Sequence, residues 1–345
     1  MNEEYGQKSL DNSNNRYTAF HYFPISTSIL QIDKIVNFDL YLLPPKKSKE
    51  PILYRAKDLP FTEENMFRLK SQGVENLLVR SEDKIYYTHY LETNLREILN
   101  NSHAFLQKRV EVLYEVTSQV VKEMLDNPGS HDLLPRSKTL VENTLNFMFR
   151  EPSTFQYMLK IASFDYHTYT HSVNVEIFSV FLAREVNIPE DELPRVGVGA
   201  LLHDLGKCRV DPKILTFPGK LSVEQFEQVK NHPEYGYKIL INDQGMKDEI
   251  QLDIVRHHHE KLTGTGYPDK LKGRDISIYA RISAIADIFD ALTTNRSYKN
   301  AFSSFNALKL MREEMTNELD TQIFKNFILL MGQKSNHFNH QKTST

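Results

Sequence analysis

Imidazole and carboxylate side chains recur at wide intervals in the second half of the chain, and their chemistry is that of metal ligands. They are His171, His203, Asp204, His232, His258, His259 and Asp287. Neutral imidazole nitrogens and ionised carboxylate oxygens suit borderline divalent ions. Such ions generate hydroxide at neutral pH by lowering the pKa of a bound water. The set therefore predicts a hydrolytic metal centre.

Two pairs of neighbours within this set predict where helices end. Successive residues of an α-helix point about 100° apart, so adjacent ligands can reach one ion only at a helix end. Gly206 supplies such an end after His203 and Asp204, and a Thr-Gly-Thr-Gly run follows His258 and His259. At such an end, Asp204 can bridge two ions through its two oxygens.

The ligands fall in a part of the chain that is expected to be entirely helical. Helices are predicted at residues 165–186, 192–205, 222–230, 233–241, 247–259, 278–294 and 304–318. Ser222 and Gln225 form a capping-box pattern, and Pro233 suits a first helical turn. Residues 131–330 are therefore predicted to form an all-α catalytic bundle.

The chain before the bundle is expected to form a small α+β regulatory domain over residues 19–90. Its β-prone runs are residues 38–43, 52–55, 76–79 and 84–87. One helix is predicted among them, with Thr62 as its N-cap and Gly73 as its stop. The polar residues 1–18 and the C-terminal residues 331–345 are expected to be disordered or flexible tails.

Residues 91–130 are predicted to form a long connecting helix. Its apolar residues recur every three or four positions and so share one stripe: Leu106, Val110, Leu113, Val116, Val120 and Met124. This stripe could pair two subunits in a homodimer or pack within its own domain, and the spacing favours neither. The expected fold class is mainly α, with a C-terminal helical bundle joined by a long helix to a small N-terminal α+β domain.

Composition limits the classes of partner. A formal net charge of −3 over 345 residues argues against a nucleic-acid polymer or a membrane surface as partner, so an anionic ligand needs a local site. The single cysteine, Cys208, cannot form an internal disulfide. Neither a secretory leader nor an apolar run of the roughly 20 residues that span a bilayer is recognisable. A cytoplasmic location is expected.

The sequence around the ligands resembles the HD-GYP family, a branch of the HD superfamily of metal-dependent phosphohydrolases. The resemblance covers roughly residues 167–301. It is carried by His171-Ser-Val-Asn-Val, His203-Asp-Leu-Gly-Lys207, Lys230-Asn-His232-Pro-Glu-Tyr-Gly236, His258-His-Glu-Lys-Leu-Thr-Gly-Thr-Gly-Tyr267-Pro268, Ala280-Arg-Ile-Ser-Ala-Ile-Ala-Asp287-Ile-Phe-Asp290 and Arg296-Ser-Tyr-Lys299. Plain HD enzymes share the metal residues but lack the Gly-Tyr-Pro loop and the Arg-x-x-Lys ending.

This resemblance implies a cyclic di-GMP phosphodiesterase that opens its substrate to pGpG, with a further cut to GMP in some members. It implies that the seven ligands hold at least two divalent ions, iron or manganese. A metal-bridging hydroxide would then attack phosphorus in line. A third ion is in doubt, because His167 stands where members with three ions have a glutamate. His167 can ligate, donate an outer hydrogen bond or face solvent.

Other residues are expected to act on the substrate. Asp204 and Lys207 are taken as catalytic, because Lys207 can neutralise charge on a non-bridging phosphate oxygen. The resemblance assigns Arg296 and Lys299 to ligand binding, where they would meet the second phosphate. Tyr267 fits either a nucleotide contact or a structural loop position. The expected substrate-binding set is Tyr267, Asp290, Arg296 and Lys299, and His257 is taken as a bystander.

Two other functions compete with this hypothesis. The chain could be a receptor that captures cyclic di-GMP and signals by protein contact while hydrolysing it poorly, although the intact ligands and Lys207 argue against this. It could also be another HD-type phosphohydrolase that acts on nucleoside phosphates or alarmones, which the loop at residues 264–268 disfavours. The N-terminal domain is expected to sense a signal or a regulatory protein and to adjust the bundle.

Overall fold

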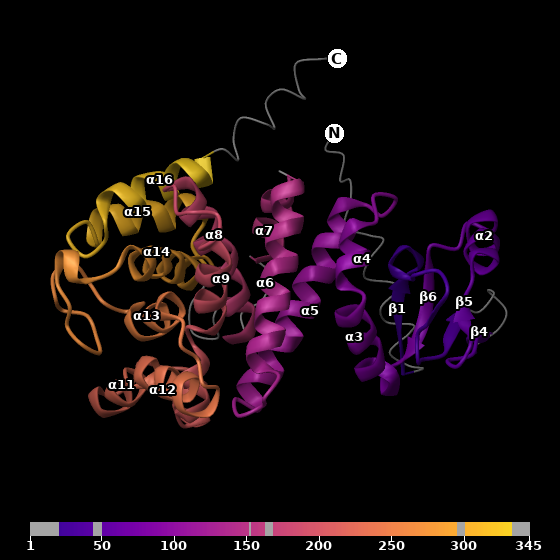
Figure 1. Ribbon diagram of the computed structural model, residues 1–345, viewed down its shortest axis with the longest axis horizontal. Coiled ribbons are helices and arrows are strands. Elements are labelled where there is room, and N and C mark those ends of the chain that lie inside the picture. Colours follow the sequence, from indigo (N-terminus) through magenta and orange to yellow (C-terminus); the bar gives the residue numbers. More distant parts are fainter. Residues whose placement is uncertain (1–20, 44–49, 152, 163–167, 295–300, 333–345) are drawn as a thin grey trace, which may run out of the picture. The chain divides into compact units, whose positions relative to one another are not determined.

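The computed structural model of the protein describes residues 21–43, 50–151, 153–162, 168–294 and 301–332 (Figure 1). The chain divides into two compact units between Val116 and Thr117, within helix α5 (Leu106–Asp126). As predicted, the fold is mainly α, with a small sheet near the N-terminus. The tail at 1–18, most of the tail at 331–345, and the predicted site residues His167, Arg296 and Lys299 lie outside the described residues.

The first unit contains an antiparallel sheet in the order β1-β6-β3-β4. Its strands are β1 (Tyr22–Ser26), β3 (Leu40–Leu42), β4 (Ile52–Arg55) and β6 (Asn76–Arg80). A second small sheet pairs β2 (Lys34–Ile35) with β5 (Pro60–Phe61). The runs predicted at residues 38–43, 52–55 and 76–79 are thus confirmed as strand regions, whereas β1, β2 and β5 were not predicted.

The predicted helix of this unit is α2 (Glu63–Ser71), which begins at a capping box. Thr62 accepts a hydrogen bond from the Asn65 backbone, while the Asn65 side chain accepts one from the Thr62 backbone. The chain turns away at Gly73, whose φ of +66° suits a residue without a Cβ. The predicted cap and stop are both confirmed.

One predicted strand is wrong, because residues 84–87 belong to helix α3 (Lys84–Thr93). Tyr87 and Tyr90 are three positions apart, so in a helix they share a face. Both rings are buried and meet the Phe38 ring edge-on, at centroid distances of 5.8 and 5.7 Å. Burial of these two rings on one helical face overrides the local preference for a strand.

The segment predicted as the connecting helix is interrupted. It contains α4 (Leu95–Asn100) and then, after a break, α5. Most of the stripe on α5 is buried within the single chain, namely Val110, Leu113, Val116, Val120 and Met124, while Leu106 is half-buried. These side chains are thus covered without a second subunit, and the homodimer stays a prediction.

The second unit is a bundle of helices. The longer ones are α6 (Leu133–Arg150), α7 (Thr154–Ala162), α8 (Thr168–Glu185), α9 (Leu193–Leu202), α13 (Glu249–His257), α14 (Ile278–Thr293), α15 (Ser304–Glu314) and α16 (Thr321–Gly332). Shorter turns and helices complete it: η4 (Leu205–Arg209), α10 (Pro212–Leu215), α11 (Val223–Val229), α12 (His232–Lys238), the π-turn η5 (Ile239–Asp243) and η6 (Gly273–Asp275).

Helix α8 lies at the centre of this unit and packs against α9, α14 and α16. Phe178 from α8, Phe289 from α14 and Phe327 from α16 contact one another edge-on, with ring centroids 5.0 to 6.2 Å apart. Helix α13 packs on α9, α12 and α14. All seven predicted helices of the bundle are present in the described residues, and none of the described helices could cross a membrane.

Candidate metal centre

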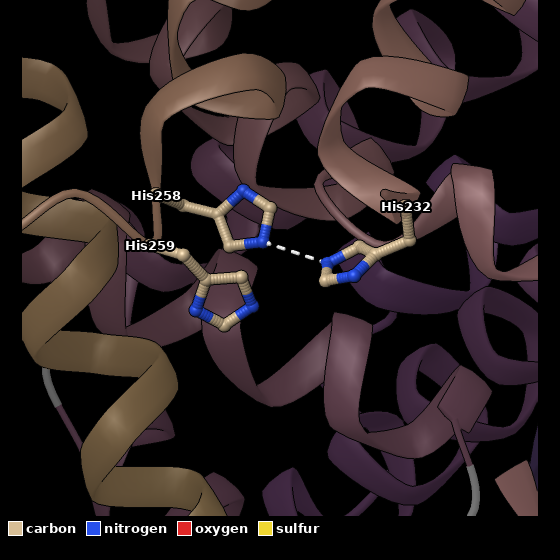
Figure 2. Close-up of side chains that lie close together, drawn as sticks. All are labelled: His232, His258 and His259. Carbon is tan, nitrogen blue, oxygen red and sulfur yellow. Dashed lines mark hydrogen bonds between the residues drawn. The ribbon is translucent and has the colours of Figure 1, made fainter. Parts of the chain in front are cut away.

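The predicted ligands gather at one place in the bundle as two neighbouring triads. The first triad is His171, His203 and Asp204, and the second is His232, His258 and His259 (Figure 2). Within each triad, one ligand atom from each residue lies within 4.8 Å of the others. All but His259 are buried from solvent, so the ligand atoms line an enclosed site.

The helix ends place these side chains, as the adjacent pairs predict. His203 is the C-cap residue directly after α9, and Asp204 is the N-cap residue of the next turn, η4. His258 is the C-cap residue directly after α13, so His259 points from the loop that follows. His232 is the first residue of α12. The predicted helix ends at both pairs are therefore confirmed.

Backbone carbonyls orient three of the imidazoles. The Nδ1 atoms of His203, His232 and His258 each lie against the carbonyl oxygen three residues earlier, at 2.7, 2.7 and 3.1 Å. A carbonyl only accepts, so Nδ1 carries the proton and Nε2 is left with its lone pair. The Nε2 of His203 is buried and has no hydrogen-bond partner among the described residues. This is the orientation that a metal-binding histidine takes.

The inward nitrogen atoms fit a cation. The Nε2 atoms of His232 and His258 lie 3.2 Å apart, along the dashed line of Figure 2. With both Nδ1 atoms protonated, two lone pairs face each other, and a positive ion beside them would relieve their repulsion. Burial lowers the pKa of His258 well below its ordinary value and that of His259 to about 3. Both rings are therefore neutral, as metal binding requires.

Two carboxylates connect the triads. Asp204 Oδ2 lies 3.6 Å from His171 Nε2, and its Oδ1 lies 3.2 Å from His232 Nε2. Asp287, from α14, places Oδ1 3.0 Å from His171 Nε2 and Oδ2 3.5 Å from His259 Nδ1. Burial acts to raise the pKa of Asp204, but Lys207 and the adjacent histidines hold it well below its ordinary value. Each carboxylate thus faces both triads in its ionised form.

Asp290, which was expected to contact substrate, lies beside His171 and engages side chains through both of its oxygens. It is buried, and its Oδ2 is 2.7 Å from His171 Nδ1. Its Oδ1 accepts hydrogen bonds from Asn174 at 2.7 Å and from Thr294 at 3.2 Å. With both oxygens engaged by side chains, Asp290 fixes the ring of His171 and turns Nε2 toward Asp287.

Lys207 lies beside the centre, on the turn η4. Its ammonium donates to Asp204 Oδ2 at 2.5 Å, and its side chain is 18 % exposed. Two close backbone approaches hold this turn against α12: a Cβ on Gly206 would lie 1.9 Å from the His232 carbonyl oxygen and 2.4 Å from the Gly236 nitrogen. Only glycine fits at Gly206, and this contact brings Asp204 and Lys207 next to His232.

The Gly-Tyr-Pro loop folds back on the second triad. The Tyr267 ring lies 4.7 Å from the His259 ring, tilted by 33°. The buried Glu260 accepts hydrogen bonds from the backbone of Asp269 at 2.7 Å and of Leu271 at 3.1 Å, which closes the loop. A Cβ on Gly266 would meet the Glu260 backbone at 2.5 Å. These contacts hold Tyr267 at the rim of the metal centre.

His257 takes no part in either triad. Its Nδ1 lies 2.7 Å from Asp253 and its Nε2 lies 2.9 Å from Asp269, which also receives two hydrogen bonds from Arg256. Because Asp269 directly follows the Gly-Tyr-Pro sequence, these contacts tie the loop to α13. His257 is thus a structural link rather than a ligand.

Sequence reasoning assigned no role to three residues that the structure places close to the site. They are Asn174, Glu260 and Lys230, and each stood in a quoted motif. Asn174 follows His171 by three residues and so shares its helical face, which is the signal that could have indicated it. The signal for Glu260 was its position directly after the histidine pair.

Comparison with known proteins agrees with this geometry. Residues 156–323 match the family model described as HD domain. The chain is 35% identical over 193 residues to Cyclic di-GMP phosphodiesterase PA4108 of Pseudomonas aeruginosa, covering 56% of this chain and 46% of that protein. It is 33% identical over 207 residues to 3'3'-cGAMP-specific phosphodiesterase 2 of Vibrio cholerae, covering 60% of this chain and 34% of that protein.

A solved structure shares the fold. The structure of Bd1817, an HDG"Y"P protein from Bdellovibrio bacteriovorus, matches with a TM-score of 0.63 at 21% identity, covering 90% of this chain and 99% of that one.

The helical unit therefore carries a domain of the HD class, whose phosphohydrolases depend on metal. These matches support the resemblance of this region to the HD-GYP family. The matched part spans only about a third to a half of the length of these two curated relatives.

Proposed function

We propose that the helical unit is a cyclic di-GMP phosphodiesterase that uses two divalent ions, iron or manganese. The observation that carries this proposal is the pair of triads spanned by Asp204 and Asp287, because each carboxylate faces ligands of both groups. Its choice of substrate is supported by the curated relatives, which are named for cyclic di-GMP or for 3'3'-cGAMP.

The side chains of the site would have separate roles in metal binding and catalysis. His171, His203 and Asp204 would hold one ion, His232, His258 and His259 the other, and Asp287 would contact both. Ions held there would supply an activated water at neutral pH and offset charge on the phosphoryl group. Lys207 would exchange its contact with Asp204 for a non-bridging phosphate oxygen, where its charge stabilises the transition state. The buried histidines of the two triads would exclude bulk water from the ions.

The proposed substrate contacts lie outside the two triads. Tyr267 would contact the nucleotide, and its place beside His259 supports this role. For Asp290 we propose a positioning role instead, since both of its oxygens already hold side chains. Arg296 and Lys299 are retained as proposed contacts with the second phosphate, on the sequence resemblance alone.

The test is hydrolysis by the full chain, purified under reducing conditions and loaded with manganese or ferrous iron. Cyclic di-GMP, 3'3'-cGAMP and linear nucleotides are supplied separately, and the products are separated by chromatography. We expect pGpG, or GMP, from cyclic di-GMP, and loss of activity after chelation. Bound metal and bound nucleotide without product would indicate the receptor instead. Preferential cleavage of a linear nucleotide or an alarmone would indicate another HD-type phosphohydrolase.

A further inference from the structure

A second lysine stands at the rim of the metal centre, on the side of the Gly-Tyr-Pro loop. Lys230 is the C-cap residue directly after α11, two positions before the proposed ligand His232. Its ammonium lies 5.9 Å from the centre of the Tyr267 ring, and that ring in turn lies against His259. Contacts between neighbouring side chains therefore lead from the second triad through Tyr267 to Lys230.

The surroundings of Lys230 suit the capture of an anion. Its ammonium also lies 5.0 Å from the Phe226 ring, and its side chain is 30 % exposed. The anion paired with it is Glu227, at 2.6 Å, whose side chain is 59 % exposed. Solvent-exposed pairs of this kind contribute little free energy, so a phosphate can replace the carboxylate at small cost. The rings of Phe226 and Tyr267 would hold the ammonium in place during this exchange.

Lys207 and Lys230 differ in what they contact near the metal centre. Lys207 contacts Asp204, a residue that faces both triads, so it would stand next to the phosphate under attack. Lys230 lies over the Tyr267 ring, which in turn lies against the ring of His259. A cyclic dinucleotide carries two phosphates on opposite sides of its ring, and only one can be attacked at a time. The other phosphate is a second anion, for which Lys230 adds a cation to those that the proposed function takes from the sequence resemblance.

We infer that Lys230 binds the phosphate that is not being cleaved and so selects cyclic dinucleotides over simple diesters. Phe226 and Tyr267 fix its ammonium. This inference rests on the proposed phosphodiesterase function, and it predicts a signature that a merely structural lysine lacks. Removing the charge should weaken binding of a substrate with two phosphates and leave a substrate with one phosphate unaffected.

The experiment compares two substrates in the manganese-loaded full chain: cyclic di-GMP, and bis(p-nitrophenyl) phosphate, which has a single phosphate. The variants are Lys230→Met, which removes the charge, and Lys230→Arg, which keeps it. Lys238→Met is the matched control, because Lys238 is a lysine with its own exposed glutamate partner, Glu234, at 2.6 Å. Metal content is measured for every variant, to detect any disturbance of His232.

For Lys230→Met we expect KM for cyclic di-GMP to rise about tenfold, equivalent to about 1.4 kcal/mol, with kcat within about twofold of the wild type. Cleavage of the simple diester should stay unchanged. Lys230→Arg should restore most of the KM, and Lys238→Met should behave as wild type.

The experiment distinguishes failure of the role of Lys230 from failure of the proposed function. Unchanged KM for cyclic di-GMP in Lys230→Met would overturn the role of Lys230 alone. Equal losses on both substrates, or lost metal, would show that Lys230 supports the centre instead, and would also overturn it. If the wild type cleaves the simple diester but no cyclic dinucleotide, the proposed function fails and this inference fails with it.

Discussion

Glu176 gives the helical unit a stability that should fall as pH rises. It lies on α8, one and a half turns beyond His171, and is fully buried. Neither carboxylate oxygen has a hydrogen-bond partner among the described residues. Burial disfavours the charged form and outweighs the opposing effect of the Thr144 hydroxyl, so the pKa of Glu176 rises from 4.5 to about 8.

The sign and the size follow from proton linkage. Below pH 4.5 the carboxyl is protonated in both the folded and the unfolded state, and it adds no pH dependence. Between that pH and about 8 the unfolded chain releases the proton while the folded chain keeps it, so unfolding becomes easier by about 1.4 kcal/mol per pH unit. Near pH 7 the destabilisation reaches about 3 kcal/mol, and it levels off near 5 kcal/mol above pH 8.

Replacing Glu176 with glutamine removes this titration. The free energy of unfolding is measured by urea denaturation at pH 5, 6, 7 and 8, followed by the helical circular dichroism signal, with chelator present throughout. The difference between Glu176→Gln and wild type should grow in favour of the variant by about 3.5 kcal/mol between pH 5 and pH 8. Glu185→Gln, at the exposed end of the same helix, is the control and should give a constant difference. Parallel curves for Glu176→Gln and wild type would refute the reasoning.

Two further substitutions test the construction of the centre. Gly206→Ala places a Cβ 1.9 Å from the His232 carbonyl oxygen, so we expect a loss of at least about 2 kcal/mol in unfolding free energy and reduced metal content. Gly129→Ala, with open space around its Cβ, should lose little, and similar losses in both variants would contradict the packing argument. Asp290→Asn removes the anionic partner of His171, so titration with manganese should show affinity reduced by about 10- to 100-fold with helix content unchanged. Unchanged affinity would remove Asp290 from the centre.

Local patterns were enough to predict most of the scaffold of the site. The adjacent pairs His203-Asp204 and His258-His259 require helix ends, and α9 and α13 end there. Ser222 and Thr62 carry capping boxes that depend only on residues within one turn. Such signals can be read from sequence because the interacting groups are neighbours along the chain.

Contacts between distant segments were harder to predict. Residues 84–87 have strand-forming side chains, but Tyr87 and Tyr90 pack on Phe38, which is far away in sequence, and this packing selects the helix. Likewise, the fit of Gly206 against α12 concerns two segments separated by a long connection. The sequence around Gly206 indicated a helix end, but it did not indicate that the backbone of α12 packs against this glycine.

Asp287 and Asp290 show that the spacing of residues in a sequence can predict which side chains lie in a site, but not what each of them does there. They are three residues apart on α14, so they share a helical face, and both were expected in the pocket. His171 lies between them, with Nε2 toward Asp287 and Nδ1 toward Asp290. One carboxylate thus faces the ligand atoms of both triads while the other holds the ring from behind. The position of α8 against α14 decides which aspartate faces the ligand atoms and which one holds the ring. That position depends on packing around Phe178 and Phe289.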